Sequence, residues 1–351
     1  MRTGTGTKQT TVRAQGAPQP GQRSAPRRVF QRHRRLLSTL IALFCAGLVV
    51  AGTLGVIRYV SAYWLYRGFA APSLPRSVVV RRHGVARRVP VIPVSVHQIT
   101  VPSRALGGYA DPVDVVLPPG YAAHPAQRYP VLYLLVGSPG SPSNFLTVSQ
   151  VGVAEAELIA AGRMKPLILV MPAGGRSFFS DQEWANSVQP GNDWETFVAS
   201  DLVNTIDSRY RTVASGAWRG LAGLSAGGFG ALNIGLHHPA TFRLLESWSG
   251  YTHADPIAGI YGRDPRVLRY NSPAYTVRAA ARQLRPDRTY IWFYSGTHDP
   301  LTPQNRAFNT ELTALGVPHQ YFLWPGAHDW GMWRTLAPRA LITASEHLGH
   351  G

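Results

Sequence analysis

A serine held between glycines is the clearest candidate for covalent chemistry in this sequence. The run Gly223-Leu224-Ser225-Ala226-Gly227 matches the Gly-x-Ser-x-Gly pattern of a nucleophile elbow, a sharp strand-to-helix turn that exposes the serine hydroxyl. One such match arises by chance in roughly one chain in four of this composition, so the flanking residues decide. An apolar, strand-like segment at 218–224 leads into the turn and a helical pattern leaves it. A Gly/Ser loop without chemistry is the alternative, and this context disfavours it.

A serine hydroxyl needs a base to take its proton and an acid to orient that base. In the fold that carries such elbows, the acid follows the serine along the chain and the histidine comes last. Asp299 and His328 each follow a late predicted strand, so we expect them to be the acid and the base. Two neighbours are alternatives that fit less well. His298 adjoins the acid and precedes the last strand, and Asp329 is suited to cap the final helix.

The negative charge that develops on an attacked carbonyl oxygen needs two backbone N–H groups, which form an oxyanion hole. Ala226, directly after the nucleophile, is expected to supply one. The second is expected from the loop at 137–140, after an apolar strand. Ser138 is the best donor there because Pro139 has no N–H. An ordinary Gly/Pro turn is the alternative for this loop.

Strand and helix patterns alternate after residue 95, which indicates a mostly parallel sheet with helices on both faces. The continuous apolar runs PVLYLLV at 130–136 and PLILVM at 166–171 are typical of central strands buried on both sides. Further strands are expected at 97–102, 113–117, 218–224, 242–248, 289–294 and 319–324.

Helices are expected at 151–163, 192–208, 226–237, 303–315 and 330–348. The second of these is predicted to start from a capping box formed by Asn192 and Glu195. The fold class is therefore α/β, with a mostly parallel central sheet flanked by helices and preceded by one transmembrane helix.

The positive charge of the chain is confined to its N-terminal part. The formal net charge is +17, yet residues 1–110 contain 17 Lys or Arg and no acid, while residues 111–351 contain 18 of each sign. Because the C-terminal part is neutral and has no arginine cluster interleaved with aromatics, we do not expect nucleic acid as a partner.

Residues 36–57 form a run without charges that is long enough, as a helix rising about 1.5 Å per residue, to cross a hydrocarbon layer of about 30 Å. Arginines are denser before this run than after it, so the positive-inside rule places the N-terminus in the cytoplasm and the rest outside. A cleaved signal peptide is the alternative. The length of the run and the lack of a nearby small-residue cleavage site disfavour it.

Four parts follow from these patterns: a disordered basic cytoplasmic tail at 1–35, a transmembrane signal-anchor helix at 36–60, a Pro/Arg-rich tether at 61–95, and an α/β-hydrolase domain at 96–351. The protein is expected to be single-pass in the cell membrane, with an extracytoplasmic domain. We expect no metal and no cofactor, because the sequence has no HExxH motif, no paired cysteines and no glycine-rich nucleotide loop.

Over residues 96–348 the chain resembles the esterase D and antigen 85 mycolyltransferase-like branch of the α/β hydrolases. The resemblance rests on the ordered segments PVLYLLVGSPG (130–140), VMPAGGRSFFSD (170–181), WETFVASDL (194–202), GLSAGGFGAL (223–232), SGTHD (295–299) and GAHDWGMW (326–333). It implies the same triad of Ser225, Asp299 and His328 and the same oxyanion pair of Ser138 and Ala226.

The chain departs from both sides of that branch. The esterases usually carry His-Gly where this chain has Val136-Gly137, and the mycolyltransferases carry Asp-Gly-Leu-Arg in that loop and Glu as the triad acid. We therefore expect an ester hydrolase that forms an acyl-enzyme on a small-molecule or lipid ester. The alternatives are an acyltransferase that uses a sugar or envelope hydroxyl, and a catalytically silent envelope protein that binds a partner.

Overall fold

The computed structural model describes residues 26–59, 71–82, 84–177, 180–284 and 289–349. The chain divides into two compact units, residues 1–59 and 60–351. In the first unit, helix α1 (Pro26–Tyr59) contains the apolar span Leu36–Val56, whose mean hydropathy is 2.2 and whose residues are exposed. It is the one helix of the described chain that is long and apolar enough to cross a membrane.

Helix α1 begins earlier than the predicted transmembrane run. The sequence predicted disorder up to residue 35, but the helix starts at Pro26. Proline suits the first turn of a helix, where its missing N–H has no partner to lose, and the Arg, Gln and Leu residues after it are good helix formers. The rest of the predicted tail, residues 1–25, lies outside the described residues.

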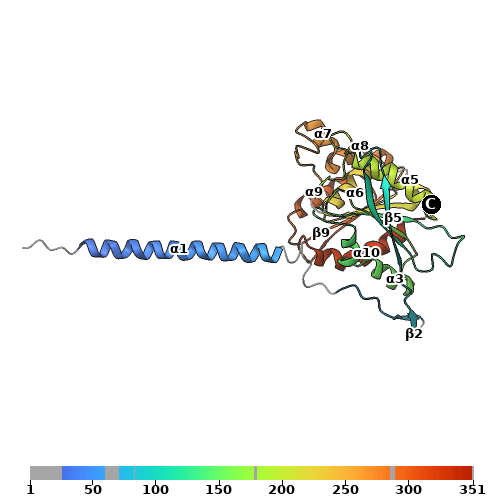
Figure 1. Ribbon diagram of the computed structural model, residues 1–351, viewed down its shortest axis with the longest axis horizontal. Helices are drawn as coiled ribbons and strands as arrows, with labels where there is room; N and C mark the ends of the chain where they lie inside the picture. The colour runs from blue at the N-terminus through green and yellow to red at the C-terminus, as the bar shows by residue number, and fades with distance from the viewer. Residues whose placement is uncertain (1–25, 60–70, 83, 178–179, 285–288, 350–351) are drawn as a thin grey trace, which may run out of the picture. The chain divides into compact units, whose positions relative to one another are not determined.

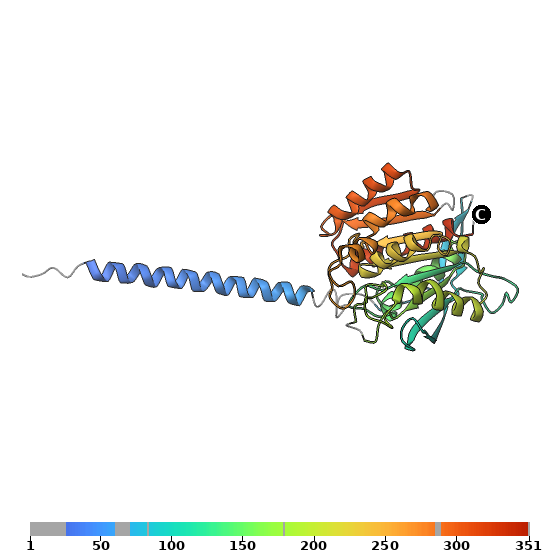
Figure 2. The ribbon, with the colours of Figure 1, turned by 90° about the horizontal axis from the view of Figure 1, so that it is seen from above.

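The second unit is built on an eight-stranded sheet in the order β10-β9-β8-β7-β5-β6-β4-β3. From β10 to β6 all neighbouring strands are parallel, while β4 is antiparallel to both β6 and β3. The strands are β3 (Ser95–Pro102), β4 (Ala110–Leu117), β5 (Val131–Leu135), β6 (Ile168–Pro172), β7 (Arg219–Leu224), β8 (Leu244–Trp248), β9 (Tyr290–Gly296) and β10 (His319–Trp324). The strands β10 and β9 form one end of this sheet, and Figure 2 shows the orange elements gathered at that end.

Helices cover both faces of the sheet, so the predicted fold class is confirmed (Figure 1). One layer contains α6 (Ala226–His237), α8 (Pro273–Leu284) and α9 (Thr302–Leu315), and the other contains α3 (Val151–Ala160) and α10 (Trp330–His347). Between them, strands β5, β6, β7 and β8 are buried at every residue, as continuous apolar strands predict.

The segment predicted as a tether contains a hairpin. Strands β1 (Ser77–Arg82) and β2 (Val85–Pro90) pair antiparallel in a separate two-stranded sheet. The valines at 78–80 favour extended backbone, and Gly84 allows the turn because its φ is +81°. The tether was predicted from its proline and arginine content, and that interpretation missed the preference of the three valines for a strand.

The predicted helix at 192–208 is replaced by three consecutive pieces: α4 (Trp194–Thr196), the π-helix η2 (Phe197–Leu202) and α5 (Val203–Arg209). The predicted capping box is wrong, because the Glu195 carboxylate does not turn back to the start of the helix. It contacts Nδ1 of His237 at 3.1 Å and Nε2 of His238 at 2.9 Å. Asn192 instead accepts a hydrogen bond from the Trp194 indole N–H at 2.9 Å.

Candidate active site

Ser225 occupies the turn between β7 and α6, and its backbone is strained. Its φ of +54° and ψ of −120° are rarely adopted by a residue with a side chain. Such a turn requires close approach of strand and helix. A Cβ on Gly227 would lie 1.9 Å from the carbonyl oxygen of Leu135, and one on Gly223 would lie 2.3 Å from that of Gly227. The two glycines of the motif are therefore required by packing, and they leave the Ser225 side chain at the C-terminal end of β7.

The structure brings the three predicted triad side chains together. His328 Nε2 lies 2.9 Å from Ser225 Oγ, and His328 Nδ1 lies 3.0 Å from Asp299 Oδ2. The carboxylate can only accept, so the ring donates from Nδ1 and leaves Nε2 to accept the serine proton. The indole of Trp333 packs edge-on against the imidazole at 5.0 Å and helps to fix its plane.

Asp299 is buried and is held by more than the histidine. Its Oδ2 also accepts a hydrogen bond from Ser249 Oγ, and its Oδ1 accepts one from the Leu301 N–H at 2.8 Å. Burial alone would raise the pKa of Asp299, but hydrogen bonds from His328, Ser249 and Leu301 hold it below its ordinary value. The side chain is therefore a carboxylate at neutral pH. Sequence reasoning missed Ser249, which follows β8 and has a φ of +59°.

The two predicted oxyanion residues line one small cavity. Ser138 and Ala226 both border a space of about 10 Å³, room for roughly one water molecule. Gly137 passes so close to the elbow that a Cβ there would lie 3.0 Å from the Cβ of Ser225. The Trp184 indole N–H donates to the carbonyl of Val136 at 2.9 Å and supports this loop from behind.

A buried carboxyl group, Glu183, borders the same cavity and was not predicted from the sequence. Its Oε2 accepts a hydrogen bond from the Tyr251 hydroxyl. Burial, reinforced by the nearby charge of Asp181, raises the pKa of Glu183 to about 8. The group is therefore largely neutral at pH 7 and places little negative charge beside the cavity.

The alternative residues lie elsewhere. His298 is bonded to its neighbour Thr297 through Nδ1 at 3.1 Å, in an exposed position. Asp329 caps α10, as predicted, by accepting the Met332 N–H at 3.0 Å. The side chain of His237, at the end of α6, is buried against Glu195. Among the described residues, no group of three or more His, Cys, Asp or Glu side chains could hold a metal ion.

A parallel sheet that presents serine, histidine and aspartate in hydrogen-bond sequence at its carboxyl edge defines a serine hydrolase of the α/β-hydrolase type. The chain belongs to the Esterase family, whose model matches residues 105–344, more than half of the chain. The matched domain is therefore of the type found in serine esterases and related acyltransferases.

Individual relatives agree with this assignment. Esterase Rv1288 of Mycobacterium tuberculosis is 30% identical over 250 residues, covering 63% of this chain and 53% of that protein. The chain thus spans about half the length of this relative. The diacylglycerol acyltransferase/mycolyltransferase Ag85B of Mycolicibacterium smegmatis is 27% identical over 208 residues, covering 48% of this chain and 63% of that protein. A solved ferulic acid esterase superposes with a TM-score of 0.65 at 25% identity, covering 73% of this chain and 100% of that chain. The predicted resemblance to the antigen 85-like esterases is confirmed.

Proposed function

We propose that the protein hydrolyses carboxylic esters through an acyl-enzyme on Ser225, with His328 as the base and Asp299 as the acid that orients it. The single observation that carries this proposal is the unbroken hydrogen-bond chain from Asp299 through His328 to Ser225. The hydroxyl proton of Ser225 can pass to His328 Nε2 without any rearrangement of the described side chains, while Asp299 remains a carboxylate.

In this mechanism, His328 Nε2 takes the hydroxyl proton while Ser225 Oγ attacks the ester carbonyl carbon. The carbonyl π electrons move to its oxygen, which the N–H groups of Ser138 and Ala226 stabilise. The tetrahedral intermediate collapses, the C–O bond to the alcohol breaks, and the imidazolium returns its proton to the leaving alcohol. Water then attacks the acyl-enzyme with the same base, which releases the acid and restores Ser225.

A fluorophosphonate probe tests the nucleophile directly, because it reacts with an activated serine. We expect stoichiometric labelling of the full chain, no labelling of Ser225→Ala, and normal labelling of Ser143→Ala, which changes an exposed serine. Equal labelling of wild type and Ser225→Ala would remove Ser225 from the mechanism. An activity profile over esters of increasing chain length then defines the acyl group.

Acyl transfer is the second candidate, supported by the likeness to Ag85B, a diacylglycerol acyltransferase/mycolyltransferase. The same acyl-enzyme would then be attacked by a sugar or envelope hydroxyl in place of water. Adding a carbohydrate acceptor to a short-chain ester separates the two. A transferase yields the acylated carbohydrate at the expense of free acid, and a hydrolase yields free acid alone.

The apolar span Leu36–Val56 supports membrane anchoring of this enzyme. With the arginine-rich segment before it, the proposed topology has the N-terminus in the cytoplasm and the catalytic domain outside. The mass of the mature protein tests whether the anchor is retained. Loss of the residues before about position 70 would show a secreted enzyme instead.

A further inference from the structure

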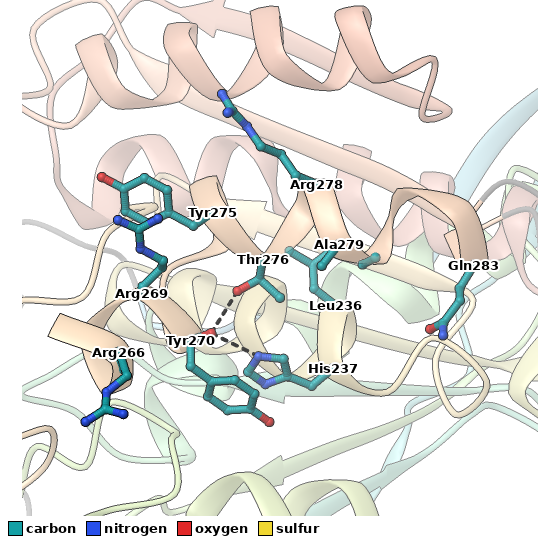
Figure 3. Close-up of a pocket in the computed structure, with 11 residues that line it drawn as sticks. Leu236, His237, Arg266, Arg269, Tyr270, Tyr275, Thr276, Arg278, Ala279 and Gln283 are labelled. Carbon is teal, nitrogen blue, oxygen red and sulfur yellow. Dashed lines mark hydrogen bonds between the residues drawn. The ribbon is translucent and has the colours of Figure 1, made fainter. Parts of the chain in front are cut away.

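A second cavity, of about 590 Å³, lies on the helical layer of the hydrolase domain. It is bordered by the C-terminal end of α6, by α7 (Pro265–Tyr270) and by α8 (Figure 3). Helix α6 starts next to Ser225, and its 12 residues span about 18 Å at 1.5 Å per residue. The described residues that line this cavity include none of those that line the oxyanion cavity. It is therefore a separate place on the molecule.

The floor of this cavity is apolar and hollow. The buried Leu236 and Ala280 line it with aliphatic groups, as does the exposed Ala279, and the two alanines are small side chains of α8. The ring of Tyr270 stacks on His237 at 4.0 Å, and the Tyr270 carbonyl is bonded to His237 Nε2 and to Thr276 Oγ1 (Figure 3). These bonds join α6, α7 and α8, so the floor is preformed.

The rim is positively charged. Arg266, Arg269 and Arg278 line the cavity, and no acidic side chain does so among the described residues. Arg266 has an exposed ion pair with Asp264 at 3.5 Å, and such a pair is weak. Arg278 is held more firmly, because its guanidinium contacts both carboxylate oxygens of Glu311, at 2.8 and 2.9 Å.

Arg269 differs from the other two arginines. Its guanidinium lies 5.2 Å from the centroid of the Tyr275 ring, and no carboxylate lies within 4 Å of it in the described part of the chain. The charge is local, because residues 261–284 contain five arginines and one acid, while residues 111–351 as a whole contain equal numbers of basic and acidic side chains.

We propose that this cavity binds a phosphate monoester carried on an apolar or ring-shaped body. Its volume lies within the range of small-molecule sites, roughly 300–1,000 Å³. The apolar floor and the tyrosine rings suit the body of such a ligand. Guanidinium groups bind phosphate oxygens in a fork geometry. A phosphate monoester carries a charge of about −1.5 to −2 at neutral pH, so it balances the positive charge of these arginines better than a ligand with a single carboxylate would.

Phenyl phosphate is the test ligand, titrated calorimetrically in phosphate-free buffer into the full chain in phosphatidylcholine nanodiscs. We expect saturable binding to wild type, with affinity reduced about tenfold or more in Arg269→Gln and in Ala279→Phe. Arg282→Gln is the matched control, because it removes an exposed arginine of α8 that does not line the cavity. Its affinity should stay within twofold of wild type.

Inorganic phosphate and phenol separate the two halves of the ligand, and each should bind at least tenfold more weakly than phenyl phosphate. Thermal unfolding and ester hydrolysis should be unchanged in all three variants, since none touches Ser225 or its partners. The proposal is overturned by absence of saturable binding to wild type, by an equal loss in Arg282→Gln, or by equal affinity for inorganic phosphate. None of these outcomes depends on the proposed esterase mechanism.

Discussion

At the scale of single residues, the imidazole of His328 is fixed by a hydrogen-bond partner at each ring nitrogen. Asp299 accepts from Nδ1, and Ser225 lies at Nε2. Replacing Asp299 by Asn should leave the shape of the site intact but let an amide N–H face Nδ1. The ring would then carry its proton on Nε2, where it cannot accept the serine proton. We expect kcat for a short-chain ester to fall on the order of 10⁴-fold.

Asp329→Asn is the matched control for this change, because Asp329 adjoins His328 and caps α10 without touching the triad. Asparagine is also a good helix N-cap, so kcat should stay within about twofold of wild type and stability should change little. Comparable losses of kcat in the two variants would mean that Asp299 acts through general stability and not through the histidine.

Ser249 is a positioning residue for the same carboxylate. Its hydroxyl donates to the Asp299 oxygen that also faces His328. A hydrogen bond to a charged group contributes about 1.5–3 kcal/mol, so Ser249→Ala should lower kcat/KM by roughly 10- to 100-fold. Ser295→Ala is the control, since this buried serine bonds to Tyr321 and Thr302 instead. Retention of full activity in Ser249→Ala would show that the other bonds to Asp299 suffice.

At the scale of elements, the strands of the eight-stranded sheet could be predicted because most are short apolar runs between turn residues, whereas the hairpin of β1 and β2 was missed. The nucleophile turn could be predicted because two glycines and a serine have fixed spacing. Helices α7 and α8 were missed, because residues 250–289 contain four prolines, three glycines and one asparagine, and their apolar residues show no clear helical period. Ser249 and Glu183 were missed for another reason. Each reaches its site through a tertiary contact that no local spacing encodes.

Glu195 joins the start of α4 to the end of α6 through His237 and His238. Burial alone would raise the pKa of Glu195, but hydrogen bonds from the two histidines lower it to about 2, against 4.5 in the unfolded chain. A lowered pKa stabilises the folded state above the unfolded value, and this stabilisation is lost as the pH falls from about 4.5 toward 2. At about 1.36 kcal/mol per unit, the full effect is about 3 kcal/mol.

Glu195→Gln should therefore lower the free energy of unfolding at pH 6, and its deficit relative to wild type should shrink as the pH falls through 4 and 3. Urea unfolding of both proteins at pH 6, 4 and 3 measures this. Glu346→Gln is the control, because this exposed acid has no ion pair with a described residue, and its deficit should be small at every pH. A Glu195→Gln deficit that does not vary with pH would contradict the assigned ionisation.

At the scale of the whole molecule, the N-terminal region differs from the hydrolase domain in net charge and in hydropathy. All the surplus positive charge lies before residue 111, around the apolar span, while the hydrolase domain is neutral overall. The Esterase model matches residues 105–344 and says nothing of this N-terminal region. Whether this region anchors the protein in the membrane, and on which side the hydrolase domain then lies, has to be tested by measuring the membrane topology.

The lone cysteine makes that test simple, because Cys45 lies within the span Leu36–Val56. In intact cells, a membrane-impermeant maleimide should leave Cys45 unlabelled. In a Cys45→Ser background, Thr310→Cys on exposed α9 should be labelled from outside, and Thr10→Cys only after permeabilisation. Labelling of Thr10→Cys in intact cells, or protection of Thr310→Cys, would reverse the proposed orientation, because the arginine-rich segment would then lie outside.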